Sequence, residues 1–316
     1  MAGGYISCLT IYRQACPLEM IILPITIEEV LNRGFTAWTK NLKISVPFIL
    51  SALVAGIIWF AYMILFVIAV MPSMLTYPNT ENIMAAIGPY LLPFGVGVIV
   101  VIVISMLIEA FFSAGAIGMS KDAALNGSTS YEEMINSGKT HFVNYFLLKI
   151  LYSLITLVGA IFVIPAILQI GDITNFDAII QNLLIIGAGF ALWIIYGIVV
   201  SVILSVAYYA LVIDNLGPVQ ALKASYMFFM NNKAAVLILW LLTVVVVIAI
   251  NFIGMLFASF EYLVIVWNLI STVVSIVIIP AVFTLWWTFL YMGKTGHNVH
   301  PEIINTPQKR ELQSNE

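Results

Sequence analysis

The chain has 316 residues, of which 62% are hydrophobic and only 9% are charged. Soluble globular domains carry about 25% charged residues, so this composition and the mean hydropathy of +1.09 exclude an ordinary soluble protein and predict an integral membrane protein. The formal net charge of −3 gives no reason to expect nucleic acid as a partner, and the expected partner is the lipid bilayer.

Residues 1–26 form an N-terminal tail that does not resemble a signal peptide. Its apolar stretch, Met20–Ile27, is short, whereas a signal peptide has a basic start, a longer apolar core and a small-residue cleavage site. Recognisable structure begins only after Met20, which is therefore an alternative start of the protein. Cys8 and Cys16 both lie in this tail, and they predict neither a disulfide framework nor a metal site.

Six stretches are long and apolar enough to cross a bilayer. A spanning helix needs about 20 apolar residues, and barrel strands do not fit because these stretches are apolar on all sides. The predicted spans are Ile44–Met71, Pro89–Met119, Phe142–Leu168, Leu183–Ile213, Ala234–Ala258 and Tyr262–Met292. The predicted fold class is an all-α integral membrane protein, with a six-helix membrane domain over residues 27–292. Residues 293–316 lack periodicity and are predicted to form a disordered cytoplasmic tail.

An internal repeat precedes the first, third and fifth spans. The segment Thr26–Thr36 (TIEEVLNRGFT) recurs as Ser130–Thr140 (SYEEMINSGKT), with five of eleven positions identical. Each segment opens with a capping box and continues with apolar residues at helical spacing. A third, diverged copy, Gly217–Lys233, starts its helix with Pro218. We therefore predict three parallel repeats of an amphipathic helix plus two spans. The amphipathic helices are predicted to anchor the bundle at the cytoplasmic face, and a gating or binding role there is the alternative.

All twelve lysines and arginines lie on one side of the six spans. They occur in the N-terminal region, in the loops after the second and fourth spans and in the C-terminal tail, with Lys149 just inside the third span. The acidic residues of the opposite loops are Glu81, Asp172, Asp177 and Glu261. By the positive-inside rule both termini are cytoplasmic, and the expected location is the cell membrane.

The segment Leu216–Trp240 (LGPVQALKASYMFFMNNKAAVLILW) and its counterpart around Trp38–Asn41 carry a resemblance to known proteins. They resemble a broad group of six-helix prokaryotic membrane proteins that includes the membrane domain of some glycerophosphodiester phosphodiesterases. The resemblance implies a membrane fold from about Thr26 to Met292. It implies no phosphodiesterase activity, because the catalytic domain of those enzymes has no counterpart in this chain.

Glu109 is the one acidic residue well inside a span, and an intramembrane carboxylate is a functional candidate by default. Ser105 and Ser113 stand four residues to either side of Glu109, so the three share one helix face. The same spacing recurs in the fourth and sixth spans, at Ser201, Ser205, Ser271 and Ser275. Each even-numbered span therefore carries a stripe of small polar residues. These serine stripes converge if the repeats surround an axis along the membrane normal. An aqueous path is one interpretation of the serines, and helix packing is the favoured one.

Lys149 lies about two turns inside the third span, at roughly the depth of Glu109 counted from the cytoplasmic side. Two interpretations follow. The lysine either pairs with Glu109 or extends its amine to the interface without a partner, and the second interpretation is favoured by its position.

Signatures of enzymes are missing from the sequence. It contains no phosphate-binding loop, no His-Glu-x-x-His and no dinucleotide fingerprint, and His297 with His300 supplies too few ligands for a metal. We therefore expect no enzyme activity and no cofactor. Two functions remain: a transporter of a small solute or lipid, and a non-transporting scaffold for membrane homeostasis. The repeats and Glu109 favour transport, whereas the absence of paired acids and a shortage of discontinuous helices favour the scaffold.

Overall fold

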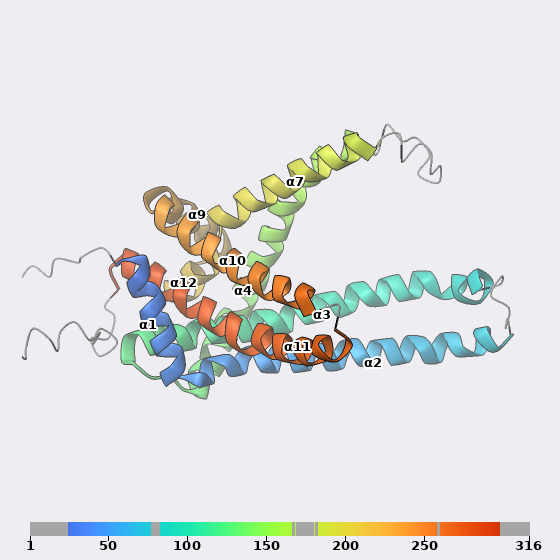
Figure 1. Cartoon of the computed structure of the whole chain (residues 1–316), viewed down its shortest axis with the longest axis horizontal. Coiled ribbons are helices and arrows are strands. Elements are labelled where there is room, and N and C mark those ends of the chain that lie inside the picture. The colour runs from blue at the N-terminus through green and yellow to red at the C-terminus, as the bar shows by residue number, and fades with distance from the viewer. Residues whose placement is uncertain are drawn as a thin grey trace, which may run out of the picture.

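A computed structural model describes residues 25–76, 83–165, 168, 180, 183–257 and 260–297. All secondary structure within these residues is helical (Figure 1). Six segments are long and apolar enough to cross a membrane: Leu42–Leu75, Ile87–Asn126, Tyr131–Phe162, Leu183–Ile213, Lys233–Phe257 and Tyr262–Thr295. The predicted all-helical fold and its six apolar segments are therefore confirmed.

The helices follow one another as three hairpins (Figure 1). The first hairpin joins α2 to α3, the second joins α4 to α7, and the third joins α10 to α11 and α12. The bounds are α1 Ile27–Lys40, η1 Leu42–Ser45, α2 Val46–Thr76, α3 Ile83–Asn126, α4 Tyr131–Val158, η3 Gly159–Phe162, α7 Leu183–Ile203, α8 Ala207–Ile213, α9 Pro218–Asn231, α10 Lys233–Phe257, α11 Glu261–Val273, η4 Val274–Ile278 and α12 Ile279–Thr295. Helix η4 is a π-helix, whereas η1 and η3 are 3₁₀-helices.

Side-chain caps start the first two repeat helices. At α1 the predicted capping box is complete, because the Glu29 N–H donates to Thr26 Oγ1 at 3.2 Å and the Thr26 N–H donates to the Glu29 carboxylate at 3.1 Å. At α4 the Glu133 N–H donates to Ser130 Oγ at 3.2 Å. The Glu133 carboxylate, however, accepts a hydrogen bond from Ser137 Oγ at 2.9 Å. The second capping box is therefore only half formed.

The second repeat differs from the prediction in one respect. A separate span was expected to start at Phe142, but α4 continues without interruption from Tyr131 to Val158. In the first and third copies Asn41 and Asn232 end the amphipathic helix, and each side-chain amide donates to the carbonyl four residues earlier at 3.1 Å. Tyr145 stands at the aligned position of the second copy. Since its side chain cannot make this cap, the helix continues.

The fourth span is interrupted about two thirds of the way along its length. Helix α7 ends at Ile203, the residues Leu204–Val206 form a turn, and α8 follows. The sixth span is also irregular, because the π-helix η4 precedes Pro280. The sixth span remains helical throughout, whereas the fourth span is discontinuous, contrary to the expected shortage of such helices.

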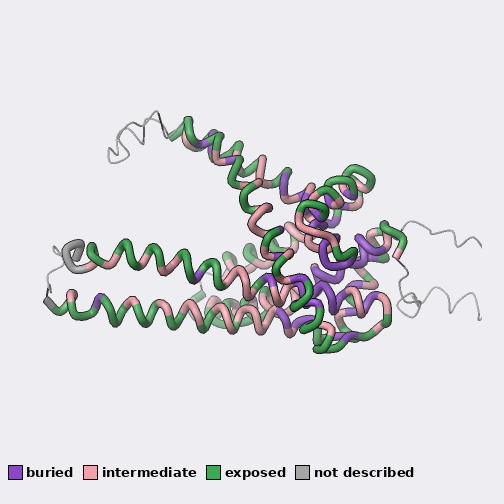
Figure 2. Tube along the Cα trace, turned by 180° about the vertical axis from the view of Figure 1, so that it is seen from behind, coloured by how far each residue is buried: buried purple, intermediate pink, exposed green. Residues whose placement is uncertain are grey.

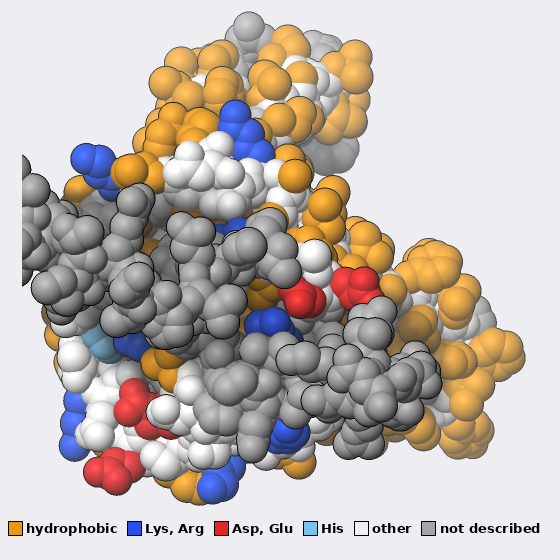
Figure 3. All heavy atoms as spheres, turned by 90° about the vertical axis from the view of Figure 1, so that its left-hand side faces the viewer, with side chains coloured by type: hydrophobic (Ala, Val, Ile, Leu, Met, Phe, Trp, Pro, Cys, Tyr) orange, Lys and Arg blue, Asp and Glu red, His pale blue; other side chains and the backbone are white. Residues whose placement is uncertain are grey.

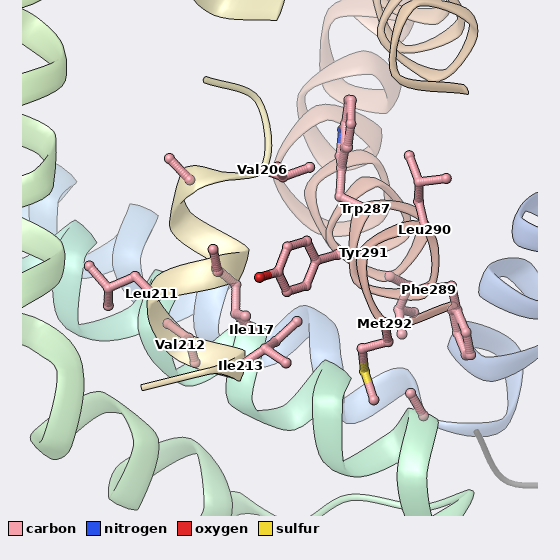
Figure 4. Packing of buried hydrophobic residues seen from close by; sticks show 14 of the residues in the cluster. Ile117, Val206, Leu211, Val212, Ile213, Trp287, Phe289, Leu290, Tyr291 and Met292 are labelled. Carbon is pink, nitrogen blue, oxygen red and sulfur yellow. The ribbon is translucent and has the colours of Figure 1, made fainter. Parts of the chain in front are cut away.

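The buried core lies at one end of the hairpins (Figure 2). Figure 4 shows part of this core, with Ile117 of α3, Val206 of the turn before α8, Leu211 of α8, and Phe289 and Met292 of α12. Away from this end the hairpins expose many large apolar side chains. Monomeric soluble proteins rarely expose large contiguous apolar patches.

Each repeat helix packs on a neighbouring even-numbered span: α1 on α12, α4 on α3 and α9 on α8. Aligned positions of the three copies make the contact. A Cβ atom at Gly34 or Gly138 would clash with an aromatic side chain of the neighbouring span, Trp286 or Phe111. The aligned Ser225 instead donates a hydrogen bond to the last residue of α7. The contact between α1 and α12 brings the two ends of the described chain together.

Charged side chains gather at the same end as the core (Figure 3). The predicted N-terminal tail and most of the predicted C-terminal tail lie outside the described residues, which leave out 1–24 and 298–316. The side chains of the acidic loop residues also lie outside the described part of the chain, namely those of Glu81, Asp172, Asp177 and Glu261. Helix α12 reaches Thr295, three residues beyond the predicted end of the membrane domain.

Candidate functional site

A cavity of about 310 Å³ lies among the helices, and each of the six spans contributes to its lining. Its lining side chains are Phe48, Ser113, Ile117, Tyr145, Tyr152, Ser201, Leu204, Ser205, Tyr208, Tyr209, Trp240, Thr243, Thr284 and Trp287. Aromatic rings and hydroxyl groups dominate this set, and none of these lining residues is an acid, a lysine, an arginine or a histidine. Small-molecule sites are typically concave, largely apolar and supplied with a few polar groups, and this cavity has that composition.

The interruption of the fourth span lies at the cavity wall. Ser205 belongs to the turn, and its hydroxyl oxygen is buried without a hydrogen-bond partner among the described residues. One turn earlier, Ser201 Oγ donates to the Ile198 carbonyl at 2.8 Å. The Ile203 carbonyl at the end of α7 accepts from Ser225 Oγ at 2.8 Å. The turn is thus held from outside by α9, while Ser205 keeps its hydrogen-bonding capacity at the wall of the cavity.

Stacked aromatic rings form much of the wall. Tyr145 of α4 stacks on Tyr208 of α8 with ring centroids 4.6 Å apart, and Tyr152 lies 6.2 Å from the same ring. On the other side Tyr209 stacks on Trp287 of α12 at 6.4 Å. Because these rings come from three different spans, the cavity depends on how the hairpins pack together.

Glu109 of α3 and Lys149 of α4 form an ion pair. Lys149 therefore has a partner in the structure, and the favoured interpretation of an unpaired lysine is wrong. Glu109 is one turn from Ser113 and Lys149 is one turn from Tyr145, so both charges share helix faces with cavity-lining residues. Glu109 lies closer than Ser113, and Lys149 closer than Tyr145, to the hairpin tip, which is the end where the two helices of a hairpin are joined. The side chains are 54% exposed for the glutamate and 22% exposed for the lysine.

The serine stripes are only partly brought together. The stripe residues that line the cavity are Ser113, Ser201 and Ser205. The hydroxyl of Ser105 is buried without a partner among the described residues. Ser271 bonds to a carbonyl of its own helix, and Ser275 is exposed in the π-helix. The sixth span reaches the cavity through Thr284 and Trp287 instead.

The aromatic lining is the part of the site that the sequence reasoning missed. Tyr145 and Tyr208 stand within five residues of predicted span ends, which is the ordinary place for interfacial tyrosines. One signal was present in the third span. Tyr145, Lys149 and Tyr152 are spaced by four and then three residues, which places three polar groups on one helix face.

A second polar cluster lies at the core end of the molecule. Asp214, in the turn after α8, accepts a hydrogen bond from the Tyr291 hydroxyl and lies 3.2 Å from His297 Nε2. His297 Nδ1 is 2.8 Å from Thr295 Oγ1, and Gly296 ends α12 in the left-handed conformation. His297 was expected in a disordered tail, but this cluster orders it against the end of α8. Within the described ranges no three His, Cys, Asp or Glu side chains could hold a metal ion.

The fold and the cavity define a class of protein, namely a helical protein with six membrane-length apolar segments and a neutral central cavity. The chain belongs to the family described as a domain of unknown function (DUF7847), which matches residues 64–292. This range contains all of the cavity-lining residues except Phe48.

The chain also has a distant relative among known proteins. The chain is 24% identical over 290 residues to an uncharacterized protein of Archaeoglobus fulgidus, and the alignment covers 85% of this chain and 95% of the relative. No solved structure matches the chain. These comparisons do not link the chain to the membrane domains of glycerophosphodiester phosphodiesterases.

Proposed function

We propose that this protein is a membrane transporter that moves a small solute through its central cavity. The observation that carries the proposal is the interrupted fourth span, which places the unpaired Ser205 hydroxyl at the cavity wall. Irregular backbone at membrane depth is tolerated only where it is buried in protein or lines a cavity. Many transporters build their substrate sites from such discontinuous helices near the bilayer midplane.

The transport proposal includes a membrane topology. The six apolar segments span the cell membrane as three parallel repeats around an axis along the membrane normal, and both termini are cytoplasmic. The one-sided distribution of lysine and arginine supports the orientation. The contacts of α1 with α12, of α4 with α3 and of α9 with the fourth span support the repeats, because an aligned position contributes to each of the three. The bilayer is the partner that covers the exposed apolar faces.

A transport role fits the chemistry of the cavity better than an enzymatic role. General acid–base catalysis needs a titratable group within hydrogen-bonding reach of the substrate. The cavity offers hydroxyl groups and aromatic rings, with no acid, histidine, cysteine or lysine among its lining residues. Such a lining can hold and release a solute, and it supplies no base that would be poised near neutral pH.

Cysteine accessibility tests the proposal. In a variant without Cys8 and Cys16, single cysteines replace each stripe residue and are treated with a membrane-impermeant thiol reagent from either side of the membrane. The seven positions are Ser105, Glu109, Ser113, Ser201, Ser205, Ser271 and Ser275. We expect Ser113, Ser201 and Ser205 to react, because these three line the cavity. Phe252→Cys, which is 58% exposed on an apolar face, is the matched lipid-facing control and should stay unlabelled.

The outcome decides between transport and the alternative scaffold role. Labelling of the cavity positions establishes a water-filled path and justifies flux measurements in proteoliposomes. If the cavity positions stay silent while Lys223→Cys on the charged surface reacts, the cavity is closed to water. The transport proposal then fails, and a non-transporting scaffold for membrane homeostasis becomes the better explanation.

A further inference from the structure

We propose that the solute is a zwitterion of the amino-acid or betaine class, and that the Glu109–Lys149 ion pair, one helical turn from cavity-lining residues, binds its two charges. The inference rests on the transport function proposed above and names the substrate class of the same site. The ligand carboxylate binds to Lys149 and the ligand ammonium group binds to Glu109, while the rest of the solute lies in the cavity.

The position of the ion pair is the first argument. Glu109 stands one helical turn from Ser113 on α3, and Lys149 stands one turn from both Tyr145 and Tyr152 on α4, so both charges share helix faces with cavity-lining residues. A charged side chain facing hydrocarbon is strongly unfavourable and normally faces the bundle interior or water. Because the Glu109 side chain is 54% exposed in the structure, water or a polar ligand must reach it when the protein lies in a membrane.

Charge balance is the second argument. Glu109 and Lys149 neutralise each other, and a zwitterion replaces both halves of the pair without leaving a charge unpaired. A ligand with one charge would leave either the carboxylate or the amine without a partner, which is strongly unfavourable in a dry site. A neutral polyol would leave the ion pair unused. Of the three ligand types, the zwitterion is the one that satisfies both charges.

Size and the aromatic wall are the third argument. The volume of about 310 Å³ lies at the lower end of small-molecule sites, which span about 300–1,000 Å³, and therefore suits a solute of amino-acid size. Tyr145 and Tyr152 stand one helical turn to either side of Lys149 on α4, and both lie beside the ring of Tyr208. Aromatic faces attract ammonium groups, including quaternary ones that cannot donate hydrogen bonds to a carboxylate.

Ligand binding to the purified full-length protein tests the inference. Trp240 and Trp287 line the cavity, so their intrinsic fluorescence reports occupancy. The probes are alanine and glycine betaine as zwitterions, choline as a cation, propionate as an anion and glycerol as a neutral polyol. We expect saturable changes with the zwitterions, at concentrations about tenfold or more below those needed for any other probe.

Variants of the ion pair make the test specific. Glu109→Gln and Lys149→Met should each weaken zwitterion binding by about tenfold or more, because one partner of a paired charge is removed. Glu132→Gln and Lys139→Met carry the same changes on exposed residues of α4 and should bind as the parent does. If a single variant unfolds, the exchanged double variant Glu109→Lys with Lys149→Glu keeps the pair and should retain binding.

Flux of the same probes into proteoliposomes separates the two proposals. Zwitterion binding without flux overturns transport and leaves the ligand class intact. Equal binding or flux of glycerol, choline and alanine overturns the zwitterion class while transport stands. Zwitterion binding that is unchanged in Glu109→Gln and Lys149→Met, or no binding of any probe, also overturns the inference.

Discussion

The Ser225 hydroxyl holds the interruption of the fourth span in place. When a helix breaks, its last carbonyls lose their intrahelical partners and need others. Ser225 is fully buried on α9 and donates to the Ile203 carbonyl at the end of α7. A hydrogen bond from one helix therefore stabilises the irregular backbone of another, directly beside the cavity-lining Ser205.

Removing this hydroxyl should destabilise the protein. We expect Ser225→Ala to lower the free energy of unfolding by about 1–3 kcal/mol, since a partly buried carbonyl is left without its donor. The measurement is thermal unfolding of the detergent-solubilised protein.

Ser201→Ala is the matched control for Ser225→Ala. Its hydroxyl bonds only to Ile198 of its own helix, and its loss should change stability by less than about 0.5 kcal/mol. Equal losses of stability in the two variants would contradict a special role of Ser225 at the break.

At the scale of elements, the contact between α3 and α4 depends on glycine. A Cβ atom at Gly115 would lie 2.7 Å from the carbonyl oxygen of Met134, and this backbone atom cannot move aside as a flexible side chain could. The two helices approach here because no side chain separates them. The ion pair of Glu109 and Lys149 bridges the same two helices toward the hairpin tips.

Gly115→Ala should therefore push α3 and α4 apart. We expect a loss of about 1–3 kcal/mol in the free energy of unfolding from the overpacked contact, measured by thermal unfolding in detergent. Gly95 lies in the same helix, and a Cβ atom at this position would meet no neighbouring atom within 4 Å. Gly95→Ala should be neutral or stabilise by up to about 1 kcal/mol through helix propensity. Similar destabilisation of both variants would refute the close-approach explanation.

The sequence predicts elements well where the signal is local. The six long apolar helices and the Thr26 capping box depend on apolar runs and on residues three apart, and both are confirmed. The break at Leu204–Val206 could not be predicted, because no proline or glycine marks it. The carbonyl of Ile203, just before the break, accepts its hydrogen bond from Ser225, about twenty residues later in the chain. The continuous α4 was foreseeable in part, since Tyr145 replaces the asparagine that ends the other two repeat helices.

In the candidate site, too, local signals could be read from the sequence, whereas contacts between distant residues could not. Glu109 attracts attention as a lone carboxylate in an apolar run, and its neighbour Ser113 lines the cavity. Thr284 and Trp287 give no such signal, because their place in the cavity depends on how the third hairpin packs against the other two. Tertiary packing thus decides which polar residues meet, while periodicity decides only which ones share a helix face.

At the scale of the whole molecule, the length of α3 constrains how the chain lies in a membrane. This helix has 44 residues, which corresponds to about 66 Å at about 1.5 Å per residue. The hydrocarbon core of a bilayer is only about 30 Å thick, so one or both ends of α3 must extend beyond it. The end with the buried core also carries the charged side chains (Figure 3). Under the proposed topology we therefore expect that end to lie in water and at the headgroups, on the side that retains lysine and arginine.

This orientation leads to a prediction about two exposed positions at opposite ends. Lys223 is exposed on α9 near the core end, whereas Phe260 is 58% exposed in the turn between α10 and α11. In a variant without Cys8 and Cys16, Phe260→Cys should react with an impermeant maleimide added to intact cells. Lys223→Cys should react only after the membrane is permeabilised. Because translocating lysine-rich loops is unfavourable, the reverse pattern would invert the topology, and with it the side from which a solute first meets the Glu109–Lys149 pair.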